Sequence, residues 1–254
     1  MSTRDRPWPP GVPSWADLAA SDPPAAARFY GAVLGWTTLD AGPESGGYLM
    51  ASVDGHAVAG IGSFGAPAWT LYIATDDADA TAEAARAAGG TVLMPPGDVG
   101  ASGRLAVLAD PSGAPFGAWQ AREHIGAGRV NEHGALAWAD LRSSDPAAAL
   151  AFYRQLFGWE FEPLAGEYGT VAAPDLPTPV GGLGPLFGVP ASQWLVYFGV
   201  DDADAAAAAA VEAGGRVVAA PETTPFGRIG QVADLDGVVI GIVATDWSQA
   251  PDRS

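Results

Sequence analysis

An internal repeat constrains the fold of this chain more than any other feature. The stretch WADLAASDPPAAARFYGAVLGW begins at Trp15, and WADLRSSDPAAALAFYRQLFGW begins at Trp138, an offset of 123 residues without a gap. DDADATAEAARAAGG from Asp76 likewise matches DDADAAAAAAVEAGG from Asp201, and GRLAVLADPSG from Gly103 matches GRIGQVADLDG from Gly227. Because self-similarity at a fixed spacing marks repeated structural units, the sequence predicts two halves of the same fold.

Length and charge limit the classes of protein and partner. The chain has 254 residues, enough for two domains that each bury a core. Its formal charge of −17 disfavours binding to nucleic acid or to an anionic membrane surface, and the absence of cysteine excludes disulfides and thiolate metal sites. We find neither a signal-peptide pattern nor an apolar run of membrane-spanning length. We therefore expect a soluble, cytoplasmic protein whose partner is a small molecule.

Each half contains the same order of elements twice. Residues 15–19 read as a strand, and a helix follows that Asp22 caps and Gly35 ends. Three short strands near residues 36–39, 48–53 and 57–61 complete a βαβββ module. A second module follows, with strands near 69–75, 91–94, 104–109 and 115–119 and a helix over 76–88. The repeat therefore predicts four modules in an α+β fold.

The domain boundaries follow from the repeat offsets and from the proline-rich start of the chain. We expect an extended lead-in over residues 1–12, a first domain over 13–122, a connecting segment over 123–134, a second domain over 135–246 and a tail over 247–254.

The motifs resemble those of the vicinal oxygen chelate superfamily, which includes glyoxalase I, bleomycin-resistance proteins and extradiol dioxygenases. The resemblance rests on the strand followed by SDPxxAxxFY, the LGW or FGW at the helix end, the DDADA opening of the second helix and the hairpin after GR. It covers about residues 13 to 246. Within the superfamily, the chain is most similar to two-domain glyoxalase-like proteins that are labelled as hydroxylases. The resemblance implies tandem glyoxalase/bleomycin-resistance-type domains, whose four βαβββ modules form cupped mixed sheets and whose fused halves replace the dimer of single-domain relatives.

The resemblance also implies places for a divalent metal, with His or Gln on the first strand of each module and Glu on the last. The first-strand places lie seven residues before the aspartate at each helix start, and all four are tryptophan. The last-strand places are all glycine. These residues are Trp15, Trp69, Trp138 and Trp194, with Gly60, Gly117, Gly182 and Gly241. Indole offers only an N–H donor and glycine has no side chain, so we expect no metal and no other cofactor.

Two interpretations of the tryptophans remain open. In one, each tryptophan fills its cup by covering the glycine on the neighbouring strand. In the other, Trp15 faces Trp69 across one cup and Trp138 faces Trp194 across the other, as walls for a flat apolar ligand. Trp119 lies two residues after Gly117 and hence on the same face of the last strand, so it is a further candidate for a wall of the first cup. Its counterpart in the second half is Val243.

Two aspartates and two arginines are the candidates for chemistry. Asp17 and Asp140 lie two residues after a tryptophan and hence on the same strand face, where a dry cup suits a general acid or base. The alternative is an aspartate that bonds backbone amides or an arginine. Arg104 and Arg228 could bind an anionic ligand group, or anchor the hairpin through Asp110 and Asp234.

The leading functional hypothesis is a metal-independent protein whose cups take an apolar or aromatic metabolite. It would either sequester this compound or catalyse an isomerisation, cyclisation or hydration with Asp17 or Asp140. The alternative is the metal-dependent glyoxalase-type lyase or dioxygenase/hydroxylase, acting on reactive aldehydes or phenols, that the resemblance implies. The sequence leaves open whether the chain is an enzyme, and whether it is a monomer or a homodimer.

Overall fold

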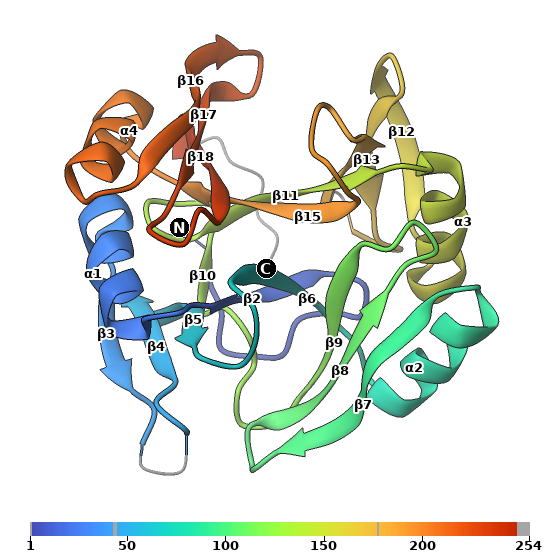
Figure 1. Cartoon of the computed structure of the whole chain (residues 1–254). Coiled ribbons are helices and arrows are strands. Elements are labelled where there is room, and N and C mark those ends of the chain that lie inside the picture. The colour runs from blue at the N-terminus through green and yellow to red at the C-terminus, as the bar shows by residue number, and fades with distance from the viewer. Residues whose placement is uncertain (1, 43–44, 177, 248–254) are drawn as a thin grey trace.

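The computed structural model describes residues 2–42, 45–176 and 178–247, and it contains the four predicted modules (Figure 1). The elements of the first half are β2 (Pro13–Ala19), α1 (Pro23–Leu34), β3 (Thr37–Asp40), β4 (Leu49–Val53), β5 (His56–Gly62), β6 (Ala68–Ala74), α2 (Ala78–Ala87), β7 (Thr91–Val99), β8 (Gly103–Ala109) and β9 (Pro115–Ala121). Those of the second are β11 (Leu136–Ser143), α3 (Pro146–Phe157), β12 (Glu160–Ala165), β13 (Tyr168–Ala172), β14 (Gly181–Pro185), β15 (Gln193–Gly199), α4 (Ala203–Glu212), β16 (Arg216–Thr224), β17 (Gly227–Ala233) and β18 (Val239–Ala244).

The helix boundaries follow from their caps. Asp22 accepts a hydrogen bond from the Ala25 amide at 2.9 Å, and Gly35 ends α1 with a φ of 70°. Asp145 and Gly158 do the same for α3. The caps of α2 and α4 are Asp77 and Asp202, one residue later than Asp76 and Asp201.

The two sheets have the same topology, in which the strand order of one module is repeated in reverse by the next. This confirms the α+β class with cupped mixed sheets. The first runs β3-β4-β5-β2-β6-β9-β8-β7, and the second follows the equivalent path β12-β13-β14-β11-β15-β18-β17-β16. The first and last strands of each module pair in parallel, as β2 does with β5, whereas β2 and β6 pair antiparallel at the centre. Figure 1 shows the outer hairpins of each sheet curving away from the other half. We call the concave face of the first sheet cup 1 and that of the second sheet cup 2.

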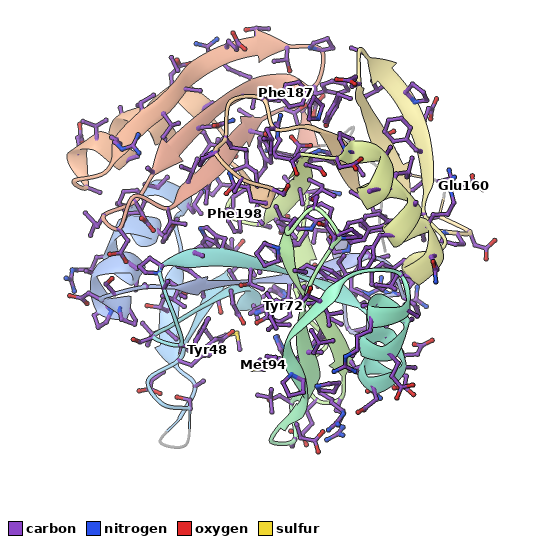
Figure 2. All side chains as sticks on the ribbon, turned by 45° about the vertical axis from the view of Figure 1, so that its right-hand side comes forward. Tyr48, Tyr72, Met94, Glu160, Phe187 and Phe198 are labelled. Atoms are coloured by element: carbon purple, nitrogen blue, oxygen red, sulfur yellow. The ribbon has the colours of Figure 1, made fainter. Side chains whose placement is uncertain are left out.

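The opposite faces of the sheets pack against each other in a core shared by both halves. Helix α1 contacts α4, and α2 contacts α3. Phe198 lies between the sheets, with ring centres 5.1 Å from Trp36 and 5.2 Å from Trp69, while Tyr48 and Tyr72 lie on the other side of the first sheet (Figure 2). The Trp159 indole also donates to the Gly11 carbonyl at 2.8 Å, across the two halves.

The lead-in is more structured than the sequence predicts. Strand β1 (Ser2–Thr3) pairs with β10 (Arg129–Val130) of the connecting segment, and β10 extends the second sheet by pairing with β11. The predicted tail lies outside the described residues from position 248 onward. Within the described ranges, no helix is both long and apolar enough to cross a bilayer.

Candidate functional site

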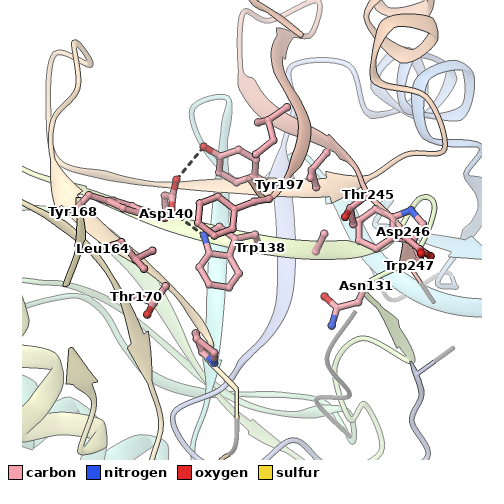
Figure 3. A pocket seen from close by; sticks show the side chains of 15 residues that line it. Asn131, Trp138, Asp140, Leu164, Tyr168, Thr170, Tyr197, Thr245, Asp246 and Trp247 are labelled. Carbon is pink, nitrogen blue, oxygen red and sulfur yellow. Dashed lines mark hydrogen bonds between the residues drawn. The ribbon is translucent and has the colours of Figure 1, made fainter. Parts of the chain in front are cut away.

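Cup 2 contains a cavity of about 410 Å³ with mostly apolar walls (Figure 3). Strands β11, β15 and β18 supply its floor, and the β16–β17 turn and the chain after β18 supply parts of its rim. Its principal side chains are Trp138, Tyr168, Tyr197, Phe226, Val243 and Trp247. Five of these six are flat aromatic rings, and they lie beside a polar group of the floor, Asp140.

Asp140 is buried and accepts four hydrogen bonds. Its Oδ1 accepts from the Trp138 indole and the Tyr168 hydroxyl, both at 2.8 Å. Its Oδ2 accepts from Arg142 Nη2 at 2.7 Å and from the Tyr197 hydroxyl at 3.0 Å. A carboxylate has about four lone-pair directions, so this network occupies all of them. For Asp140, the structure therefore matches the alternative to a general acid or base, an aspartate that bonds an arginine.

Strand geometry assembles this network. Trp138, Asp140 and Arg142 alternate onto one face of β11, and Trp138 lies opposite Tyr197 of β15. Gly182 lies beside Asp140 on β14, and a Cβ there would collide with the Asp140 carboxylate and the Tyr168 hydroxyl. The glycine thus makes room for the aspartate and the tyrosine.

Cup 1 contains the same aspartate without the arginine. Asp17 Oδ1 accepts from the Trp15 indole at 2.7 Å and from the Tyr48 hydroxyl at 2.6 Å. The place of Arg142 is taken by Ala19. Burial raises the pKa of Asp17, and hydrogen bonds from Tyr48, Trp15 and Tyr72 oppose this only in part.

Side chains occupy the space in cup 1 that corresponds to the cavity. The His124 ring packs edge-on against Trp15 with centroids 4.4 Å apart, and against Trp119 at 5.6 Å. The Trp119 indole donates to the His124 carbonyl at 2.9 Å and fixes this segment. Trp119 therefore lies in cup 1 as predicted, whereas its counterpart Val243 leaves space in cup 2.

The expectation for Trp69 and Trp194 is wrong. Trp69 lies opposite Leu18 on the core face of the sheet, where its indole donates to the Tyr30 hydroxyl at 3.2 Å. Trp194 donates in the same way to Tyr153 at 3.0 Å. The helix caps explain the error: counting seven residues back from Asp77 and Asp202 gives Thr70 and Leu195, and a slip of one residue reverses the strand face.

Arg104 and Arg228 lie outside the lining of the cavity, and their predicted anchors were also wrong. Arg104 donates to Asp79 at 2.7 and 2.9 Å, and Arg228 pairs with Asp204. Both arginines therefore tie the second strand of a hairpin to the first turn of α2 or α4. Asp110 and Asp234 instead cap their own tight turns, and Asp234 also accepts from Tyr30 at 2.9 Å.

The residues at the family's metal places do not fit a divalent ion. With the corrected register, the places in cup 2 are Trp138, Leu195, Gly182 and Gly241, and none of these side chains offers an oxygen, an imidazole or a thiolate to a metal. A Cβ at Gly241 or Gly117 would collide with the ring of Tyr197 or Tyr72. Tyrosines and aspartates thus cover these glycines. The interpretation in which tryptophans cover them is wrong. The described residues include no cluster of three or more His, Cys, Asp or Glu that could hold a metal.

Sequence reasoning missed the tyrosines, Arg142 and His124. The repeat contained a signal for the tyrosines, since Tyr72 matches Tyr197 at an offset of 125, and Tyr48 matches Tyr168 at 120. Arg142 and His124 differ between the halves, so a search for repeated residues could not find them.

The chain belongs to the glyoxalase/bleomycin resistance protein/dioxygenase superfamily, whose model matches residues 13–117 and 135–242. It is 43% identical over 250 residues to the "Putative glyoxylase CFP32" of Mycobacterium tuberculosis, a match that covers 92% of this chain and 94% of the relative. It is 38% identical over 260 residues to the anthracycline biosynthesis protein DauV of Streptomyces sp. strain C5, with 92% and 93% covered.

Among solved structures, the Mn(II)-bound glyoxalase from Novosphingobium aromaticivorans superimposes with a TM-score of 0.66 at 16% identity. That match covers 99% of this chain and 87% of the glyoxalase. The match supports the two-domain fold. At 16% identity it carries no information on whether this chain binds a metal.

Proposed function

We propose that cup 2 binds a flat, largely apolar aromatic metabolite without the help of a metal. The observation that carries this proposal is the cavity of about 410 Å³, walled by Trp138, Tyr197, Phe226 and Trp247. Small-molecule sites typically have volumes of about 300–1,000 Å³ and combine apolar walls with a few oriented polar groups. The name of DauV supports the ligand class, because anthracyclines are flat polycyclic aromatic compounds.

Sequestration or carriage of this metabolite fits the site better than acid–base catalysis in cup 2. A general base needs a free lone pair within reach of the substrate proton, but four protein donors occupy the Asp140 carboxylate. Its ion pair with Arg142 at 2.7 Å also fixes the orientation of the carboxylate. Asp140 thus orders the floor of the binding site.

Acid–base chemistry at Asp17 is the second candidate function. The raised pKa of this buried carboxyl suits a proton donor in an isomerisation, cyclisation or hydration. A substrate would have to displace His124, whose ring packs against Trp15, the indole that donates to Asp17. Asp17→Asn tests this candidate, since a catalytic role requires loss of turnover in any assay that detects a reaction.

Isothermal titration calorimetry with 2-hydroxyanthraquinone tests the binding function. Val243→Trp places the bulk of Trp119 in cup 2 and is expected to weaken binding at least about tenfold, with Val243→Ile as the control for the strand position. Phe226→Ala removes an exposed wall, so it is expected to weaken binding without unfolding the protein. Unchanged affinity in both Val243→Trp and Phe226→Ala would overturn the proposal.

A further inference from the structure

We infer that the ligand of cup 2 carries a hydroxyl group, which donates its proton to the phenol oxygens of Tyr168 and Tyr197. This inference rests on the proposed binding function and specifies its ligand class. It follows from which hydrogen-bonding positions on the floor are already used.

Four donors on the floor share one acceptor, Asp140. Trp138, Tyr168, Tyr197 and Arg142 each donate to Asp140, at 2.7 to 3.0 Å. A tyrosine hydroxyl has a single proton, so neither Tyr168 nor Tyr197 keeps one for a ligand. Burial and the nearby Asp140 charge raise the pKa of both phenols, which therefore keep their protons at neutral pH.

Acceptor positions remain on the two phenol oxygens. Each has two lone pairs. Tyr197 receives one hydrogen bond, from Arg142 Nη2 at 3.1 Å, and Tyr168 interacts with the Trp138 indole. One lone pair on each oxygen is thus left to the cavity that both tyrosines line.

This pattern distinguishes ligand groups. At the two phenol oxygens, a carbonyl or ether oxygen would meet another acceptor and lose its hydrogen bonds to water without replacement, whereas a hydroxyl would be satisfied. A carboxylate would meet the same acceptors in a chain with a net charge of −17. An ammonium group gains little, because Arg142 already neutralises Asp140 at 2.7 Å.

Three matched compounds test the inference by calorimetry: 2-hydroxyanthraquinone, 2-methoxyanthraquinone and anthraquinone-2-carboxylate. We expect the hydroxyl compound to bind about five- to tenfold more tightly than the methyl ether, the difference that one hydrogen bond makes, and more tightly than the carboxylate. In the double variant Tyr168→Phe/Tyr197→Phe, the hydroxyl and ether compounds should bind within about twofold of each other. The matched control is Tyr48→Phe/Tyr72→Phe in cup 1, which should keep the preference.

The outcomes separate the inference from the proposed function. Equal affinity of the hydroxyl and ether compounds for the wild type would overturn the inference and leave aromatic binding intact. A preference that persists in Tyr168→Phe/Tyr197→Phe would also overturn it. The comparison within the wild type needs no variant, so a misfolded variant does not remove the test. Failure of all three compounds to bind, by contrast, counts against the proposed function.

Discussion

Two aspartates at equivalent places lie in different electrostatic environments. Asp140 pairs with Arg142 at 2.7 Å, whereas burial raises the pKa of Asp17 beside Ala19. One substitution between the halves thus separates an arginine-paired carboxylate in cup 2 from a carboxyl in cup 1 whose pKa is raised by burial. The difference explains why a search for identical residues in both halves overestimates the similarity of the two sites.

His124 makes the stability of cup 1 dependent on pH. Burial lowers its pKa to about 4, from about 6.5 in the unfolded chain. The folded state thus binds the proton less well, so its stability is complete above pH 6.5 and declines as the pH falls toward 4. The loss amounts to at most about 3 kcal/mol.

Urea denaturation at pH 7 and pH 4.5 checks this prediction. In His124→Phe, which keeps a ring against Trp15 and Trp119, we expect a smaller difference between the two free energies of unfolding than in the wild type. His56→Phe removes a histidine outside the cup and is the matched control. The same difference in the wild type and His124→Phe would contradict the prediction.

At the scale of the element, one residue decides which face of a strand enters the cup. The DDADA motif offers two aspartates as the helix cap, and Asp77 rather than Asp76 accepts the hydrogen bond from the Ala80 amide, at 2.9 Å. Asp77→Ala should therefore destabilise the protein by about 1 kcal/mol, with little change in Asp76→Ala. Thermal unfolding of the two variants checks this, and an equal effect in both would contradict the assignment.

The sequence predicts most of the elements and half of the cup residues. The repeat and the caps at Asp22 and Gly35 place β2 and α1, so Trp15 and Asp17 were assigned to the correct face. The faces of β6 and β15 were assigned wrongly, because two adjacent aspartates made the helix start ambiguous. Contacts between distant segments, such as His124 with Trp15, depend on the path of the connecting segment, which has no local periodicity.

At the scale of the whole molecule, the shared core and the altered metal places predict a chain that functions without a divalent ion. The protein purified without added metal should contain substoichiometric Mg, Mn, Fe, Ni and Zn by inductively coupled plasma mass spectrometry, because the tryptophans, glycines, Thr70 and Leu195 at the family places supply no imidazole or carboxylate ligand. Dialysis against EDTA should leave the affinity for 2-hydroxyanthraquinone unchanged. One tightly bound ion per half, or affinity lost with the metal, would contradict the proposed function.

The unequal cups also predict how many ligands one chain binds. Duplication alone would give two equivalent sites, but Trp119 and His124 fill cup 1 where Val243 leaves the cavity of cup 2. Calorimetry with 2-hydroxyanthraquinone should therefore give one site per chain, and Val243→Trp should remove it. A stoichiometry of two equal sites would contradict this assignment, since it would require His124 to leave Trp15 at little cost in free energy. A single site would mean that the first half supports the second through the shared core while the second half binds the ligand.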